Sequence, residues 1–501
     1  MGGLRALALL VLAGCAQLFG IDNTTSAVTP DAPPPTPMVS LSFDRLSIGA
    51  TVVRAPQPLD PPLMATYLVP DATDPTILDG VPAMQSASNT WSATIATGTP
   101  AADFNLPDYP TALERQWSFA RTMYGLFGQM EHPNRQPAPS PATIRTTITL
   151  PSGYVSTESF QMFAIGTWAI HGFLAAELPA PNLGATAINT TLAYDTAANH
   201  FQAITGRPLD AITSADAVLV LRYVGNQLTG QLVASFGQTG ADTVSGAMAA
   251  VAASSALDVT IQPAMPQTRF GAVRPSVANI AMGWDLRAAP GYLYANNNGP
   301  LLAAAALTPA SAAKITQAYG NPFVARGWNA IFNWNNYEYR TVTVAGPNLP
   351  TTLYAGLQQL AEPAAALSLT IPAPLPITIS LDGIALSADN LSVKLDATKP
   401  ATASFVADRP GSTYTNVQVY ELVPNAPTGA TSLVYQFRYS ASGFGTSYEI
   451  PPSVLQVGHY YTIRANCITG GYPAINSGDL TQRDLPFSQG YADSGVFTVT
   501  Q

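Results

Sequence analysis

Residues 460–467, with the sequence YYTIRANC, decide the fold class because their apolar and polar side chains alternate. Successive side chains of a β-strand point to opposite faces, so this stretch has one apolar face and one polar face. The apolar face consists of Tyr461, Ile463, Ala465 and Cys467. Arg464 and Asn466 belong to the polar face. The pattern predicts a half-buried strand in which Cys467 is a small core residue and not a reactive thiol.

Six more runs between residues 373 and 501 are typical of short strands. They are residues 377–381, 392–395, 403–405, 417–420, 434–437 and 496–499. Together with residues 460–467 they make seven short strands with turns between them. This spacing predicts a β-sandwich for residues 373–501.

Residues 455–465, LQVGHYYTIRA, resemble the later part of a fibronectin type III domain, in which a Leu and a Gly precede a Tyr-containing strand. The resemblance implies an immunoglobulin-like sandwich. The early Trp of fibronectin type III domains has no counterpart in residues 373–501, which leaves a generic immunoglobulin-like sandwich open.

Three further segments before residue 373 are rich in strand patterns. Residues 39–103 carry short alternating runs between Pro-rich turns and predict a sandwich-like module. Residues 104–265 predict an irregular β-rich module, with a hairpin turn at Val224-Gly225-Asn226-Gln227. Residues 266–372 predict a third β-rich module. We therefore expect a mainly β fold of tandem antiparallel β-sandwich modules, immunoglobulin-like or fibronectin-like, with one or two short helices.

One helix is predicted at residues 309–319, inside the third module. Thr308 is a suitable N-cap, and Pro309 fits the first helical position. The residues that follow are mostly good helix formers, and Gly320 stands where a left-handed residue commonly ends a helix.

The composition is typical of exported β-rich proteins. Only 10% of the 501 residues are charged, while the chain contains 44 Pro and 38 Gly. Its surface must therefore consist mainly of Thr, Ser, Asn, Gln and Ala. The formal net charge is −9 and the sequence has no basic run, so nucleic acid is not an expected partner.

The N-terminal residues predict export and lipid attachment. Arg5 supplies a positive charge, residues 6–12 are apolar, and Leu12-Ala13-Gly14-Cys15 resembles the lipobox of bacterial lipoproteins. The apolar run is shorter than the roughly 20 residues that span a bilayer. The resemblance implies that residues 1–14 are a signal peptide and that Cys15 carries lipid chains such as palmitate. Ala16 in place of Asp implies, by the enteric sorting rule, delivery to the outer membrane.

Residues 15–38 are expected to form a tether that begins at the lipidated Cys15. They contain few large apolar side chains after Ile21, and residues 31–37 have the sequence DAPPPTP. Such a segment buries too little apolar surface to fold, and its prolines favour an extended, polyproline-like conformation.

The sequence contains none of the common catalytic or phosphate-binding motifs, such as a Gly-x-Ser-x-Gly elbow or a His-Glu-x-x-His helix. The four histidines, His132, His171, His200 and His459, are scattered along the chain. A zinc site drawn from the first three, with Glu131 as a base, is the alternative to scattered surface and core histidines. We predict no catalytic residue, no metal ligand and no cofactor.

Residues 327–340 combine five aromatic residues with four asparagines. Flat apolar rings beside amide groups suit the apolar face and the hydroxyl rim of a sugar. The candidate glycan-binding residues are Trp328, Trp334, Asn335, Asn336, Tyr337 and Tyr339. Tyr292 and Tyr294 with Asn296-Asn297-Asn298 form a similar set. The alternative is a hairpin that turns at Asn335-Asn336 and buries its tryptophans.

Two hypotheses about function follow. The preferred one is a non-enzymatic, lipid-anchored envelope protein that presents a binding or scaffolding surface, expected at the outer membrane. The alternative is an anchored carbohydrate-binding or hydrolytic protein with a site in residues 104–372. The expected partners are the membrane, through the lipid on Cys15, and envelope proteins or polysaccharide.

Overall fold

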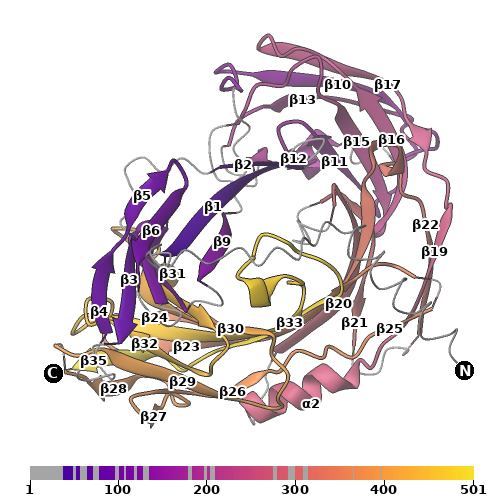
Figure 1. The fold of residues 1–501 in the computed structure, drawn as a ribbon. Helices are drawn as coiled ribbons and strands as arrows, with labels where there is room; N and C mark the ends of the chain where they lie inside the picture. The colour runs from indigo at the N-terminus through magenta and orange to yellow at the C-terminus, as the bar shows by residue number, and fades with distance from the viewer. Residues whose placement is uncertain are drawn as a thin grey trace, which may run out of the picture. The chain divides into compact units, whose positions relative to one another are not determined.

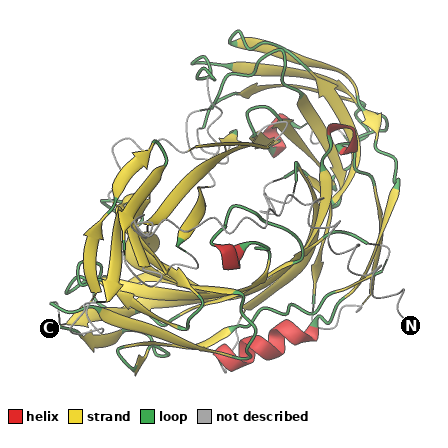
Figure 2. Ribbon diagram, viewed as in Figure 1, coloured by secondary structure: helices red, strands yellow, loops and turns green. Residues whose placement is uncertain are grey.

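A computed structural model shows a mainly β fold with several sheets and one α-helix among the residues that it describes (Figures 1 and 2). The described residues are 38–48, 52–56, 65–70, 78–95, 101–106, 109–117, 121–127, 135–178, 183–196, 200–203, 209–274, 279–291, 299–308, 314–364, 366–396 and 398–500. The mainly β class expected from the sequence is confirmed. The chain divides into two units, residues 1–38 with 94–97 and residues 39–93 with 98–501, and the binding surface discussed below belongs to the second unit.

Eight antiparallel strands form the part of the largest sheet that matters for function, in the order β21–β20–β23–β24–β34–β33–β30–β31. Their bounds are β20 Asn279–Ala289, β21 Leu301–Leu307, β23 Asn329–Val344, β24 Leu349–Ala361, β30 Tyr414–Pro424, β31 Leu433–Gly443, β33 Tyr460–Gly470 and β34 Phe487–Asp493. In Figure 1, β23, β24, β30 and β33 can be followed as neighbouring parts of this sheet. Segments more than a hundred residues apart in sequence therefore contribute to one surface.

The other strands of the largest sheet extend this run. They are β3 Ala65–Pro70, β4 Leu78–Pro82, β7 Ala101–Leu106, β8 Tyr109–Trp117, β11 Glu158–Ala164, β12 Ala169–Gly172, β14 Gln202–Ala203, β15 Val218–Val224, β16 Gln227–Ala234, β18 Ala249–Ala250, β28 Leu391–Lys394 and β35 Phe497–Thr500. β8 pairs in parallel with β31, and β16 pairs with β21. The largest sheet thus contains strands from both sides of residues 103, 265 and 372, the module boundaries expected from the sequence. The module boundaries themselves remain a prediction.

Four smaller sheets and four helical segments complete the described elements. The sheets contain β1 Met38–Ile48, β2 Val52–Pro56, β5 Met84–Ala87, β6 Thr90–Thr94 and β9 Thr122–Phe127; β10 Thr143–Thr149, β13 Ala187–Ala193 and β17 Ala241–Ala247; β19 Ser255–Thr260, β22 Lys314–Tyr319 and β25 Leu367–Ser368; and β26 Pro376–Leu381, β27 Ile384–Ala385, β29 Ala401–Ala407 and β32 Ser447–Ile450. The helical segments are η1 Ala175–Glu177, α2 Ala264–Val273, η3 Val324–Arg326 and η4 Ile475–Ser477. None of the described helices is long and apolar enough to cross a membrane.

Each strand of the eight-stranded run buries one face in a hydrophobic core. Trp284, Phe332 and Trp334 belong to a core that extends from residue 163 to residue 492. A second core, under β30, β31 and β33, contains Cys467 together with the other apolar residues of the stretch 460–467. Cys467 is fully buried, and burial raises the pKa of its thiol to about 11, so the prediction of a core cysteine is confirmed.

The predicted helix at residues 309–319 is wrong in its described part. Residues 314–319 form β22, which pairs with β19 in an antiparallel register of six residue pairs. Helix propensity is a weak preference, and cross-strand pairing overrides it here. Residues 309–313 lie outside the described residues.

The α-helix of the described chain is α2, which was not predicted. Pro266 lies in its first turn, where a missing backbone N–H costs little, and Arg269 and Phe270 are buried. Tertiary packing of these two side chains stabilises a ten-residue helix whose sequence carries little helical periodicity. The predicted hairpin at Val224–Gln227 is confirmed, with Gly225 at a φ of 58°.

Candidate binding surface on the sheet

The face of β23, β24 and β34 opposite the Trp334 core carries a small apolar cluster at Leu360 and Phe487 and, beside it, two rows of uncharged side chains. Register partners in a sheet point to the same face, so residues that are paired across three strands form a row. One row is Asn335, Gln358 and Gln489, and the next is Tyr337, Gly356 and Tyr491. We call these six residues the amide–tyrosine patch. All of them except the buried Gly356 are partly exposed.

Side-chain hydrogen bonds hold the glutamines of the patch in place from both sides. Gln358 Nε2 donates to Asn333 Oδ1 over 3.0 Å, and Asn333 Nδ2 donates to Asp285 Oδ2 over 3.0 Å. On the other side, Gln489 Nε2 donates to Asn466 Oδ1 over 3.0 Å. Asn466 Nδ2 in turn donates to Asn416 Oδ1 over 2.6 Å.

The hydrogen bonds of the Gln358–Gln489 pair run to residues on either side of it. Each Nε2 group donates to a neighbouring asparagine, while among the described residues neither Oε1 accepts a hydrogen bond. The side chain of Asn335, next to Gln358 in the row, makes no hydrogen bond within the described residues. The row therefore presents two fixed carbonyl acceptors and one complete amide group.

The carboxylate at one end of these chains is Asp285. Burial raises the pKa of Asp285, although the neighbouring Arg287 guanidinium and the Asn333 amide act in the opposite direction. Arg287 Nε donates to Asp285 Oδ1 over 3.0 Å. The guanidinium of Arg287 therefore balances the charge of Asp285, which is linked to Gln358 through Asn333.

The tyrosines of the patch lie around a glycine. A Cβ added to Gly356 would lie 2.2 Å from Cε1 of Tyr491, so the Tyr491 ring fills the space above the Gly356 backbone. Tyr337, the partner of Gly356 on β23, has its ring centroid 6.1 Å from that of Tyr339. Tyr339 is the most exposed tyrosine here, at 36%. The glycine thus lets one ring lie against the sheet between neighbouring tyrosines.

Arg464 and Asp493 border the patch and fix the Tyr491 ring. The Arg464 guanidinium lies 4.9 Å from the Tyr491 ring centroid and also contacts the rings of Tyr420 and Tyr435. Its Nε and Nη2 donate to the two carboxylate oxygens of Asp493 over 2.6 and 3.0 Å. Burial opposes the charge of Arg464, but Asp493 raises the pKa of its guanidinium above the ordinary value. Arg464 is therefore a permanent cation that Asp493 neutralises.

The structure separates the predicted glycan-binding residues into two groups. Asn335, Tyr337 and Tyr339 lie on the polar face, as part of the patch or beside it. Trp328, Trp334 and Asn336 are buried, and the two tryptophans belong to the core. No turn occurs at Asn335-Asn336, because β23 continues through both residues as one strand of 16 residues. The second aromatic set, at residues 292–298, lies outside the described residues.

Gln358, Gln489 and Tyr491 were not predicted as site residues. They alternate with core residues on β24 and β34, so strand periodicity alone places each on a polar face. Nothing local indicates that β24 and β34 are neighbours, since 130 residues lie between Gln358 and its partner Gln489.

The histidines of the described chain each pair with a nearby carboxylate. His171 Nε2 lies 2.8 Å from Glu177 Oε2, His459 Nδ1 lies 2.7 Å from Glu421 Oε1, and His200 pairs with Asp195. No group of three or more potential metal ligands gathers within the part of the chain that the structure describes. His132, like Cys15 and the rest of residues 1–37, lies outside that part.

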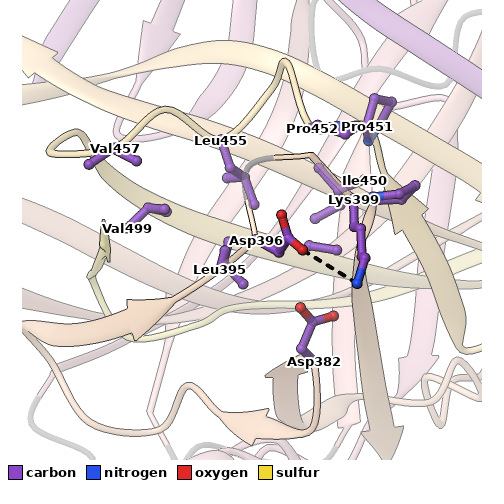
Figure 3. Close-up of a pocket in the computed structure, with 12 residues that line it drawn as sticks. Asp382, Leu395, Asp396, Lys399, Ile450, Pro451, Pro452, Leu455, Val457 and Val499 are labelled. Atoms are coloured by element: carbon purple, nitrogen blue, oxygen red, sulfur yellow. Dashed lines mark ion pairs between the residues drawn. The ribbon is translucent and has the colours of Figure 1, made fainter. Parts of the chain in front are cut away.

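A small cavity of about 120 Å³ opens beside the core of residues 379–499 (Figure 3). Its apolar lining includes Leu395, Leu455 and Val499. Asp396 pairs with Lys399 at its rim, and hydrogen bonds from the hydroxyl and the backbone N–H of Thr398 lower the pKa of this carboxyl. The charged groups at this rim therefore stabilise a turn, whereas the amide–tyrosine patch offers acceptors toward solvent.

Comparisons with known proteins do not place the chain in a family. No protein-family model and no curated protein matches it. Among solved structures, it is similar at 9% identity to Escherichia coli alpha-2-macroglobulin activated by porcine elastase, over 92% of this chain and 43% of that one. The chain thus spans less than half of that protein's length. The TM-score of 0.14 does not indicate a shared fold.

Proposed function

We propose that the chain is an exported protein, anchored through lipid on Cys15, that binds an envelope ligand on the amide–tyrosine patch. The observation that carries the binding role is the row Asn335–Gln358–Gln489, in which hydrogen bonds from Nε2 hold both glutamines while their Oε1 atoms accept none from the described residues. Side chains that internal hydrogen bonds hold in one orientation lose little entropy when a ligand binds. The patch residues lie on β23, β24 and β34, so strands that are more than a hundred residues apart in sequence form one binding site.

The anchoring part of the proposal rests on the order of residues in Leu12-Ala13-Gly14-Cys15 and on the charge and apolar run before them. Acyl chains contribute roughly 0.8 kcal/mol per buried methylene, and stable anchoring takes more than one chain. A Pro-rich segment between Cys15 and residue 38 would hold the sheets away from the lipid surface. We further propose that residues 373–501 form a fibronectin-like or immunoglobulin-like unit, in agreement with the strand pattern and the core that β26, β29, β30 and β33 share.

Labelling with a palmitate analogue tests the anchor. Cells that produce the full chain are expected to incorporate the label into it, and the Cys15→Ser variant is expected to lose all of it because the serine hydroxyl replaces the acceptor thiol. The matched control is Cys467→Ser, which removes the buried cysteine and is expected to keep the full label. An unlabelled wild-type chain, or equal labelling of the Cys15→Ser variant, contradicts the anchor.

A further inference from the structure

We infer that the ligand of the amide–tyrosine patch is a neutral polysaccharide that lies across strands β23, β24 and β34. This inference rests on the proposed binding function and names its ligand class. A hydroxyl-rich chain is the polymer whose donors and apolar ring faces match what the patch presents.

The hydrogen-bonding groups of the patch match those of a sugar chain. Sugar hydroxyls are both donors and acceptors, so they can donate to Gln358 Oε1 and Gln489 Oε1. Asn335 adds an amide that can donate and accept within the same row. Neighbouring strands are about 4.8 Å apart, so the row repeats its polar groups at nearly the spacing of consecutive sugar rings in a polymer.

The rings of the patch can contact the apolar face of a sugar. Tyr337 and Tyr491 lie one row away from the amides and flank Gly356, so an apolar sugar face can rest on Tyr337, beside Tyr491, while its hydroxyls reach the glutamines. Tyrosine combines an apolar ring with a polar hydroxyl group, so it suits a contact that is partly exposed to solvent. The Arg464 guanidinium lies over the Tyr491 ring, 4.9 Å from its centroid, and fixes the position of this ring in the folded sheet.

The patch and its borders have no uncompensated charge. None of the six patch residues is ionisable near neutral pH, and the charged groups at its borders are paired, Asp285 with Arg287 and Arg464 with Asp493. An anionic polymer would meet no uncompensated cation, and a cationic one would meet no uncompensated carboxylate. The patch is therefore complementary to an uncharged ligand.

Affinity electrophoresis of the full chain tests the inference. Native gels contain hydroxyethylcellulose, laminarin, glycogen or mannan as neutral probes, and alginate or heparin as anionic probes. We expect retardation by at least one neutral polysaccharide and by neither anionic one. The double variant Gln358→Ala/Gln489→Ala is expected to bind at least about tenfold more weakly, which corresponds to roughly 1.4 kcal/mol.

Three more variants make the test independent of misfolding. Asn335→Ala removes an amide that bonds to no other described side chain, so it is expected to weaken binding without lowering the unfolding temperature. Gln456→Ala and Phe444→Ala change exposed residues away from the patch and are expected to bind like the wild type. Thermal unfolding of every variant is measured in parallel.

Each outcome of the electrophoresis decides the inference. Retardation that the patch variants lose and the controls keep supports it. Absence of retardation in all neutral gels, retardation by an anionic polysaccharide alone, or binding that is unchanged in both the double variant and Asn335→Ala overturns it. Palmitate labelling is scored separately, so loss of the anchor and loss of the polysaccharide ligand are distinguishable.

Discussion

Trp334→Ala is expected to lower the free energy of unfolding by about 3–5 kcal/mol, the usual range for removing a core tryptophan. The Trp334 side chain is fully buried in the core that contains Trp284 and Phe332, on the face of β23 opposite the amide–tyrosine patch. Urea denaturation followed by circular dichroism measures the loss. At temperatures where the variant remains folded, polysaccharide binding is expected to stay at the wild-type level.

A matched control for this variant is Trp334→Phe. The indole N–H of Trp334 has no hydrogen-bond partner among the described residues, so phenylalanine keeps most of the ring volume and removes an unsatisfied donor. We expect it to be clearly more stable than Trp334→Ala. A Trp334→Ala protein of wild-type stability that no longer binds polysaccharide would place the indole on the ligand side and contradict the described orientation of β23.

Glu338→Ala is expected to cost about 3–5 kcal/mol, because it leaves the largely buried guanidinium of Arg274 without its counter-ion. Glu338 is fully buried on the core face of β23, and Arg274 Nη1 lies 3.1 Å from its Oε2. Arg274 directly follows α2, and its Nη2 donates to the carbonyl oxygen of Asp493 over 3.0 Å. Burial lowers the pKa of Arg274, and the Glu338 carboxylate acts in the opposite direction. Chemical denaturation measures the loss.

Two further variants separate the buried ion pair from a general effect of losing charge. Lys314→Ala removes one partner of an exposed pair with Asp258 and is expected to change stability by about 0–1 kcal/mol. The double variant Glu338→Leu/Arg274→Leu is expected to be more stable than Glu338→Ala, because it leaves neither charge unpaired. If Glu338→Ala costs no more than Lys314→Ala, the ion pair is not buried as described.

Much of the fold could be predicted because strands leave a period-two signal in the sequence. The alternation at residues 460–467 predicted both the strand β33 and the burial of Cys467. The Gly-Asn dipeptide at residues 225–226 predicted a hairpin by its backbone requirements alone. The helix prediction for residues 314–319 was wrong because helix propensity is local, whereas the pairing of these residues with β19 depends on residues 255–260.

The binding surface could be predicted only in part. The asparagine and tyrosine content of residues 335–339 predicted a binding site on what is now β23. Composition alone does not distinguish Asn335 from Asn336. Strand alternation makes that distinction, since it directs the side chain of Asn336 to the core and that of Asn335 to the polar face. Gln489 and Tyr491 could not be predicted as site residues, because their place depends on long-range pairing between β24 and β34.

Disulfide formation between Gln358→Cys and Gln489→Cys most directly tests whether β24 and β34 assemble the binding surface. Register partners in an antiparallel pair have Cα atoms about 4.5–5.5 Å apart, within the range of about 4.4–6.8 Å that a disulfide spans. A control pair, Gln358→Cys with Gln418→Cys, lies three strands apart and four residues out of register, at about 20 Å. After mild oxidation and denaturation, we expect the first pair to lose both introduced thiols in an intrachain bond and the control pair to retain them. Free thiols in both variants would contradict the register on which the amide–tyrosine patch and its ligand depend.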